Sequence, residues 1–197
     1  KIGSKHRGYQ DMMTIHGTFG SGSFDDAVKC PEGRNQEDWI SMHAVEFYNQ
    51  LTLFFTVIQD SCTDETCPHM SAGPGFKYLW QDDNEYKKPT EMPAKQYISL
   101  LFDWADRKLG NIHFFPSDPK AKYPANFKNE TGKIFRRFLR VFAHIYNHHA
   151  NSLKETEAVT PFNTLFRHFY KFVKEFGLVK DDEFAPLKPF IEQLGMK

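Results

Sequence analysis

The sequence has few cysteines, no excess of charge of either sign and no long apolar run. Basic and acidic residues both number 25, so the net charge at pH 7 is zero. Nucleic-acid binders usually carry a basic excess, because neutralising phosphates drives their affinity, so no nucleic-acid partner is expected. No segment reaches the roughly 18 apolar residues of a transmembrane helix, so no membrane span is expected either. An odd count of three cysteines in 197 residues disfavours a disulfide framework and favours a metal site in a reducing compartment.

Signatures of catalysis are also missing. The sequence holds no GxxxxGK(S/T) phosphate loop, no GxSxG nucleophile motif, no HExxH metalloprotease motif and no set of protein-kinase motifs. The start of the chain carries no apolar secretory signal. These absences favour a binding protein over an enzyme.

Apolar residues recur at intervals of three and four, which predicts amphipathic helices. The first helix would begin after Asn35, an N-cap candidate, with Glu37 and Asp38 in its first turn, and would run to about Gln59. Further helices are expected at about 94–109, 127–149, 161–176 and 186–194. Together they predict an all-α bundle over residues 35–197, preceded by an N-terminal arm over residues 1–34. With 20 Phe, its core should be rich in aromatic rings.

Residues 60–92 lack periodicity, although a short β-hairpin could pair 76–80 with 86–88. An irregular segment of this length needs a reason, and a metal site would supply one. Cys62-x4-Cys67 lies in this segment, and His144-x4-His149 lies at the end of the third long helix. Two thiolates and two imidazoles suit structural zinc. In a regular helix, however, His148 shares a face with His144, and His69 is a further candidate.

The third long helix carries a basic face without acidic neighbours. Arg136, Arg137 and Arg140 lie close together by helical spacing, and Lys133 is one turn away. Guanidinium groups match phosphate oxygens, so this face could bind a phosphorylated peptide, although the pattern alone favours a solvated helix surface.

The start of the first long helix combines acidic residues with an aromatic one. Glu37, Asp38 and Trp39 could receive a basic amphipathic helix, with Glu46 further along. The competing interpretation makes Trp39 a buried staple and the two carboxylates partners of the helix dipole.

Several strings resemble the Mob family over about residues 18–195. They are VEFYNQ at 45–50, the segment 62–74, FPS at 115–117, RVFAHIY at 140–146, FVKEF at 172–176, APL at 185–187 and IE at 191–192. The resemblance implies a Mob-type helical bundle stapled by one structural Zn²⁺ ion, with irregular loops and room for one short β-hairpin. Its ligands would be Cys62, Cys67, His144 and His149.

The resemblance also implies a function. Mob proteins are coactivating adaptors of NDR/LATS-type kinases, downstream of Hippo-like kinases in growth control and mitotic exit. They act in the cytoplasm, with the nucleus, spindle pole and cell cortex as further locations, and this chain is expected to be a monomer when free. The basic N-terminal segment of the kinase would dock on Glu37, Asp38, Trp39 and Arg34.

Phosphothreonine peptides of an upstream kinase would bind Arg136, Arg137, Arg140, Lys87 and Lys88. Thr18 matches a position that is phosphorylated in some relatives. Arg34 departs from the acidic residue of many relatives, which puts the identity of the kinase in doubt. Two alternatives stay open: a phocein-like phosphopeptide scaffold that activates no kinase, and a hydrolase with a solvent-open zinc ion.

Overall fold

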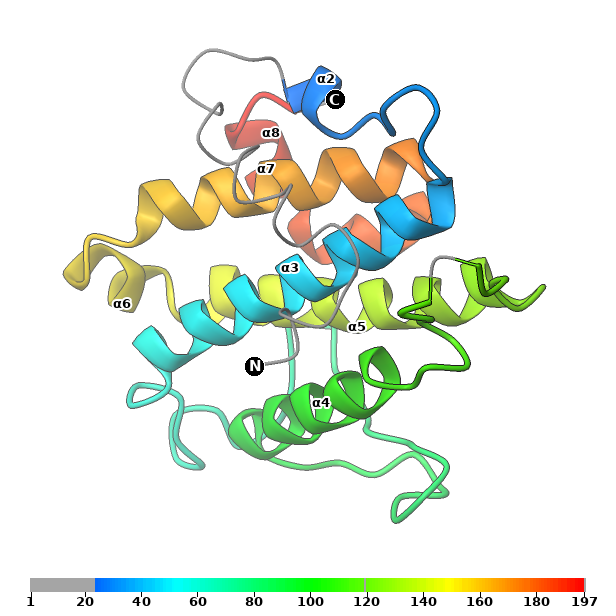
Figure 1. Cartoon of the computed structure of the whole chain (residues 1–197). Coiled ribbons are helices and arrows are strands. Elements are labelled where there is room, and N and C mark those ends of the chain that lie inside the picture. The colour runs from blue at the N-terminus through cyan, green and yellow to red at the C-terminus, as the bar shows by residue number, and fades with distance from the viewer. Residues whose placement is uncertain (1–23, 119, 197) are drawn as a thin grey trace.

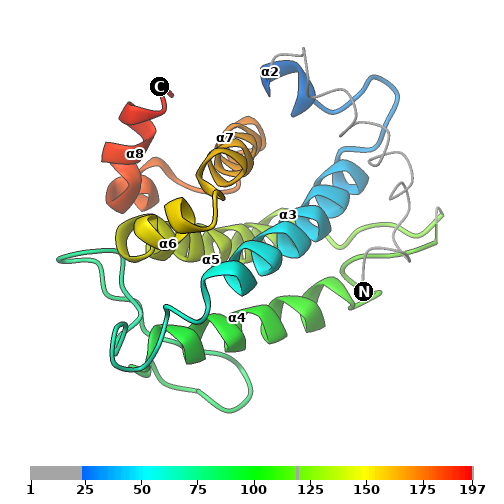
Figure 2. The ribbon, with the colours of Figure 1, turned by 90° about the vertical axis from the view of Figure 1, so that its left-hand side faces the viewer.

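The protein folds into a bundle of helices, seen here in a computed structural model that describes residues 24–118 and 120–196 (Figure 1). Its long helices are α3 (Gln36–Ile58), α4 (Ala94–Leu109), α5 (Phe127–His148) and α7 (Val159–Glu175). Its shorter elements are α2 (Phe24–Ala27), α6 (Ala150–Glu155), the 3-10 helix η2 (Asp181–Leu187) and α8 (Lys188–Gln193). Helix α3 lies against α4, α5 and α7, and is therefore the central helix (Figure 2). The predicted all-α bundle is confirmed.

Helix α3 begins where its capping residue predicts. Asn35 has an extended backbone, and its side chain accepts a hydrogen bond of 2.9 Å from the Asp38 backbone N–H. That bond satisfies one of the donors that the first turn of a helix leaves without a partner. Glu37 and Asp38 stand in the same turn, where the helix dipole favours negative charge.

Aromatic rings from three helices fill the core. Phe47 of α3 is fully buried and meets the rings of Phe135 on α5 and of Phe169 and Phe172 on α7. The ring centroids are 5.3–5.9 Å apart with interplanar angles of 60–82°. Edge-to-face contacts of this kind add to the free energy that burial alone contributes. The expected Phe-rich core is therefore centred on α3.

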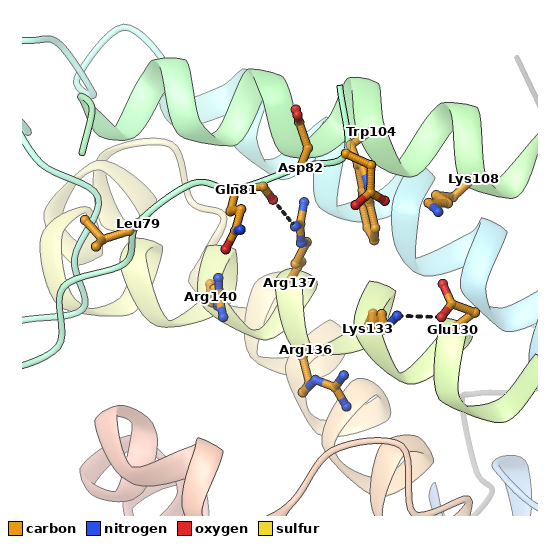
Figure 3. Close-up of a pocket in the computed structure, with 11 residues that line it drawn as sticks. Leu79, Gln81, Asp82, Trp104, Lys108, Glu130, Lys133, Arg136, Arg137 and Arg140 are labelled. Carbon is orange, nitrogen blue, oxygen red and sulfur yellow. Dashed lines mark hydrogen bonds and ion pairs between the residues drawn. The ribbon is translucent and has the colours of Figure 1, made fainter. Parts of the chain in front are cut away.

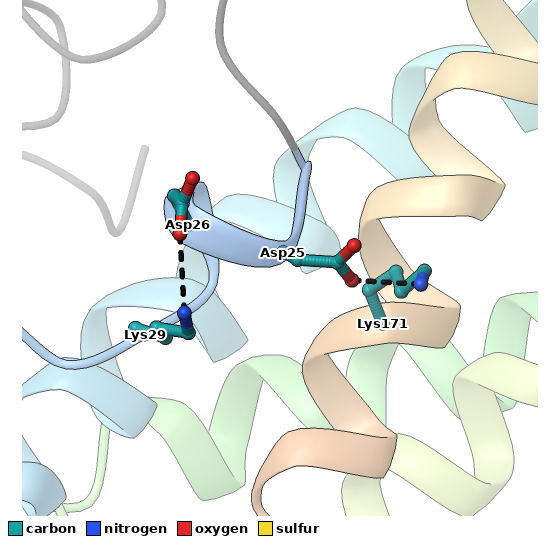
Figure 4. A network of polar contacts seen from close by, with 4 residues as sticks. All are labelled: Asp25, Asp26, Lys29 and Lys171. Carbon is teal, nitrogen blue, oxygen red and sulfur yellow. Dashed lines mark hydrogen bonds and ion pairs between the residues drawn. The ribbon is translucent and has the colours of Figure 1, made fainter.

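Part of the predicted N-terminal arm packs on the bundle. Trp39 is 3% exposed, and its indole Nε1–H donates a hydrogen bond of 2.9 Å to the carbonyl of buried Val28. Asp25 of α2 forms an ion pair of 2.7 Å with Lys171 of α7 (Figure 4). Solvent screens an exposed ion pair, so this one adds little to stability. The buried Trp39–Val28 hydrogen bond therefore holds the segment more firmly than the ion pair does.

The expected hairpin is reduced to isolated bridges in the described residues. Ser71 pairs with Lys77, and Trp80 pairs with Thr90 through two backbone hydrogen bonds of 2.8 Å. The Asp82 carboxylate accepts hydrogen bonds from the backbone N–H groups of Asn84 and Tyr86. This side-chain turn takes up donors that a longer ladder would need.

The later helices follow the predicted boundaries with two differences. Helix α6 is an additional element, because α5 ends at His148 and a new helix begins at Ala150. The last predicted helix is split into η2, which contains Pro186, and α8. Within the described residues, no helix combines the length and the apolar character needed to cross a membrane.

The central position of Phe47 gives a stability prediction. Phe47→Ala leaves a cavity among three rings and should lower the free energy of unfolding by about 3–5 kcal/mol. The matched control on the same helix is Leu53→Ala, since Leu53 is 65% exposed and should change stability by less than about 0.5 kcal/mol. Urea unfolding followed by circular dichroism measures both, and equal midpoints would contradict the assignment of Phe47 to the core.

Candidate metal centre and anion-binding pocket

Two cysteines from the loop after α3 and two histidines from the end of α5 converge in the interior. The ligand atoms of Cys62, Cys67, His144 and His149 lie within 4.8 Å of one another, and all four residues are buried. The two S···N distances are 3.5 and 3.6 Å, and the two Nε2 atoms are 3.2 Å apart. Metal–sulfur bonds of about 2.3 Å and metal–nitrogen bonds of about 2.05 Å give tetrahedron edges of about 3.6 Å (S···N) and about 3.4 Å (N···N). These three of the six donor–donor distances match the edges of a tetrahedral site, and the other three lie within 4.8 Å.

The hydrogen bonds of both imidazoles leave Nε2 as the bare nitrogen. Nδ1 of His144 lies 2.8 Å from the Ser71 carbonyl oxygen, which only accepts, so Nδ1 carries the proton. Nδ1 of His149 lies 3.0 Å from Ser61 Oγ. The Ser61 hydroxyl donates its own proton to the Ile58 carbonyl at 2.7 Å, so it accepts one from His149. Both Nε2 lone pairs therefore point into the cluster.

Burial keeps these groups neutral while no metal ion is bound. It lowers the pKa of His144 to about 3 and that of His149 to about 4, so both rings are uncharged at pH 7. Burial, with the neighbouring Cys67 thiol, raises the pKa of Cys62 to about 12. Two bare nitrogens 3.2 Å apart have no proton to share, and their lone pairs repel. A cation between them and the thiolates would satisfy all four donors.

A break in the helix brings His149 to the cluster. His149 has φ −124° and ψ 21°, and it stands between the last residue of α5 and the first of α6. Its backbone N–H still donates to the Ile145 carbonyl, while its carbonyl accepts from Leu153. The ring thus leaves the face that a continuous helix would give it. The alternative candidate His148 instead contacts Ser71 Oγ at 3.0 Å.

The loop approaches α5 through a glycine. Gly73 has a φ of 81°, and a Cβ atom there would lie 3.0 Å from the Asn147 side-chain oxygen. A larger residue would therefore be strained by the positive φ and would require the Asn147 side chain to move. His69, the remaining candidate, forms an exposed pair with Glu91 at 2.5 Å and takes no part in the cluster.

A basic pocket of about 380 Å³ lies between α4, α5 and the 79–83 segment (Figure 3). Helix α5 places three of the predicted residues in its lining. Five lining side chains are basic and three are acidic. The basic ones are Lys108, Lys133, Arg136, Arg137 and Arg140, and the acidic ones are Asp82, Asp83 and Glu130.

Arg137 forms the floor of this pocket. Its guanidinium carbon lies 4.2 Å from the ring centre of Trp80 and 4.0 Å from that of Trp104. One of its nitrogens donates to the Gln81 carbonyl at 2.6 Å. Because its environment is desolvated, the pKa of Arg137 is lowered from its usual value. Arg137 is thus clamped in place and contributes a fixed positive charge.

Arg136 and Arg140 keep more of their hydrogen-bonding capacity. Arg140 donates to the Tyr97 hydroxyl at 2.7 Å and lies over the Tyr78 ring at 5.2 Å. Arg136 is held near Glu183 with a Nε–Oε1 distance of 3.7 Å. Each guanidinium has five N–H donors, so both retain donors for a phosphate oxygen.

A second concavity follows the junction of α3 and α7. It has a volume of about 440 Å³ and is lined mainly by apolar atoms. The lining residues are Gln50, Phe54, Thr160, Pro161, Thr164, Leu165 and His168. Leu53 and Val57 of α3, which are 65% and 42% exposed, extend the apolar surface beside it. We call this concavity the α3–α7 groove.

A profile of the Mob1/phocein family matches residues 16–187. The chain belongs to this family. It is 40% identical to the maintenance of ploidy protein mob1 of Schizosaccharomyces pombe over 98% of this chain and 91% of that protein. It is 41% identical to human MOB kinase activator 3A over 82% and 75% of the two chains. With MOB kinase activator-like 1A of Arabidopsis thaliana it shares 38% identity over 97% and 89%.

Two of the expected binding residues lie elsewhere in this Mob chain. Lys87 and Lys88 are exposed and are not among the lining residues of the basic pocket, although the side chain of Gln81, which does line it, donates a hydrogen bond of 3.0 Å to the Lys87 carbonyl. Trp39 is buried, so it is the staple of the competing interpretation and not an exposed kinase contact. Thr18 lies outside the described residues.

The remaining residues of the expected kinase surface are accessible to different degrees. Arg34 is exposed, and Glu37 and Asp38 are half-buried. The Asp38 carboxylate accepts a hydrogen bond of 2.8 Å from the Tyr123 hydroxyl. Asp38 therefore also helps to hold the loop before α5 against α3.

The structure adds pocket residues that the sequence pattern did not indicate. Lys108 and Trp104 come from α4, and Leu79 comes from the irregular segment. Lys108 lies in the last turn of α4, where a cation is common for its interaction with the helix dipole. Finding Lys108 and Trp104 from the sequence would have required a prediction that α4 packs beside α5.

The converging donors predict a metal content that can be measured. The purified protein should hold about one transition-metal ion per chain, and Cys62→Ser should lose it and melt at a lower temperature, because the donor set is then incomplete. Cys30→Ser is the matched control, since Cys30 lies outside the cluster. Elemental analysis by mass spectrometry reads the metal directly. Full occupancy in Cys62→Ser would contradict the assignment.

Proposed function

We propose that this protein is a non-catalytic adaptor that binds and coactivates protein kinases of the NDR/LATS type. Family membership carries this proposal, because relatives 38–43% identical over most of the chain are named MOB kinase activators. The metal site supports an adaptor over a hydrolase. Four protein donors around one ion leave no open position for a catalytic water.

We further propose that the ion is structural zinc. Two thiolates and two imidazoles at tetrahedral spacing are the donor set that zinc prefers. Such an ion would hold the loop after α3 against the end of α5, and its binding free energy would contribute directly to folding. The Ser61 and Ser71 hydrogen bonds would orient the two imidazoles toward it.

The α3–α7 groove is the surface we assign to the kinase. Gln50, Leu53, Phe54 and Val57 share one face of α3 by their i, i+3, i+4, i+7 spacing. Glu46 stands one turn before Gln50, and its carboxylate accepts a hydrogen bond from the Gln50 side-chain amide. An apolar groove with a carboxylate beside it suits a basic amphipathic helix, whose apolar face would enter the groove.

The basic pocket supports a second activity, the binding of phosphothreonine peptides from an upstream kinase. Arg136 and Arg140 retain free donors above the fixed charge of Arg137, and a phosphate group carries nearly two negative charges at pH 7. With both surfaces occupied, the protein would join an activating kinase to its target. If only this pocket functions, the protein is a phocein-like phosphopeptide scaffold, which is our second candidate.

We extend the proposal to the cellular setting of the protein. We propose a cytoplasmic protein that acts in Hippo-like or mitotic-exit-type signalling, with the nucleus, spindle pole or cell cortex as sites of action. Phosphorylation of Thr18 is proposed as its regulatory modification. We expect a monomer when no partner is bound.

Kinase docking is tested by blocking the α3–α7 groove. Thr164 is exposed and lines the groove, so Thr164→Arg should fill it and repel a basic helix, weakening binding to the N-terminal segment of an NDR-type kinase at least about tenfold. Isothermal titration calorimetry at fixed salt measures the affinity.

The matched control for docking is Thr156→Arg. Thr156 makes the same type of hydroxyl bond to the carbonyl four residues earlier but lies outside the groove. Equal affinity of both variants and the unchanged protein would contradict the groove assignment. No binding by any of them would leave the scaffold as the better account.

Phosphopeptide binding is tested at Arg136 and Arg140, the two arginines that retain unused N–H donors. The double variant Arg136→Gln/Arg140→Gln should weaken binding of a phosphothreonine peptide by at least about tenfold, because each charged hydrogen bond to phosphate is strong. Fluorescence anisotropy with a labelled peptide measures this, and the unphosphorylated peptide should not bind. Retained affinity in the double variant would place the phosphate elsewhere.

A further inference from the structure

The basic pocket is longer than one phosphate needs. Leu79 and Arg140 lie at one end, Arg137 lies in the middle, and Lys108 and Lys133 lie beyond Trp104 at the other end (Figure 3). The first group lies around the arginines assigned to phosphothreonine. The second group has no role in that assignment.

Lys108 is a cation without a counter-charge. Among the residues that the structure describes, no carboxylate lies within ion-pair distance of it, and its ammonium stands 5.8 Å from the ring centre of Trp104. Lys133 faces the same end of the pocket and is paired with Glu130 at 2.5 Å. The two lysines come from different helices, α4 and α5, and they line the same pocket because the bundle packs these helices side by side.

Of the three acidic lining residues, Glu130 compensates Lys133, but none of the three is paired with Lys108 in the described structure. Asp82 is committed to the Trp80 indole at 3.0 Å and to two backbone N–H groups. Asp83 forms no ion pair with either lysine in the described structure. A ligand with negative charge at the Lys108 end would therefore gain an attraction that the protein itself leaves unused.

The spacing fits a second residue of the same peptide. Lys133, Arg137 and Arg140 lie on one helix, so the lysine is about 6 Å along the axis from Arg137 and about 10 Å from Arg140. An extended peptide covers this distance in about two to three residues. A side chain two or three positions from the phosphothreonine would thus reach Lys108 and Lys133.

We propose that Lys108 and Lys133, at the end of the pocket beyond Trp104, form a second anion subsite that takes a carboxylate or a second phosphate of the same peptide. We call it the lysine subsite. It rests on the phosphothreonine-binding function proposed above and defines its ligand class: peptides in which an acidic or phosphorylated residue stands two or three positions from the phosphothreonine.

The test uses short labelled peptides and the full chain. The reference peptide has one central phosphothreonine among alanine, serine and glycine. Further peptides add one aspartate, or one phosphoserine, two or three positions before or after it. Fluorescence anisotropy should show about fivefold tighter binding for the aspartate on one side of the phosphothreonine and a larger gain for phosphoserine there. The favoured side reports the direction of the peptide, and the phosphoserine arm distinguishes the two sources of charge.

Three variants assign any gain to the lysine subsite. Lys108→Met keeps the aliphatic cover on Trp104 and removes the charge, so the gain from aspartate should fall to less than about twofold. Glu130→Gln releases Lys133 and should increase the gain. Lys154→Gln is the control for net charge, because Lys154 is exposed on α6 and does not line this pocket.

The outcomes separate the two proposals. If the reference peptide binds and an added acid gives no gain on either side, or gives a gain that survives Lys108→Met, the lysine subsite is wrong while phosphothreonine binding stands. If neither the reference nor any acidic peptide binds, phosphothreonine binding and the lysine subsite are both wrong. A gain that Lys108→Met removes and Lys154→Gln leaves intact supports the lysine subsite.

Discussion

The convergence of four donor atoms between the loop after α3 and the end of α5 is the constraint on which much of this structure depends. Bringing His149 to Cys67 ends α5, starts α6 and thereby turns the chain toward α7. Bringing Ser71 to His144 holds the irregular segment against α5 near the basic pocket. The segment has almost no secondary structure of its own, so a metal ion held by these donors would supply the cross-link that a backbone ladder does not.

Arg137 connects this segment to the functional surface. Its guanidinium stacks between Trp80 of the segment and Trp104 of α4, and it holds the Gln81 carbonyl. One side chain therefore ties α4, α5 and the loop together at the floor of the pocket. This explains why the pocket joins residues distant in the chain, and why its cationic centre is rigid. Rigid charge suits phosphate recognition, because little side-chain entropy is lost on binding.

Local patterns sufficed for the long helices and for the kinds of donor atom. Asn35 marks the start of α3 and Gly110 marks the end of α4, because caps and breakers act within one turn. Helix α6 was absent from the prediction, which ended the third long helix at about 149, because the break at His149 depends on contacts with residues distant in the chain such as Cys67.

The sequence by itself determined the all-α class, the boundaries of α3 and α4, and the presence of two thiols and several imidazoles at spacings that a metal ion accepts. These features depend on neighbours within a turn or two. Only the tertiary structure decided that His149 and not His148 faces the thiols, that Trp39 is buried, and that Lys108 and Lys133 meet beside Trp104. Each of these depends on how segments far apart in the chain pack together. Packing depends on how the faces of different helices fit together and fill the space between them. No single stretch of the sequence contains that information.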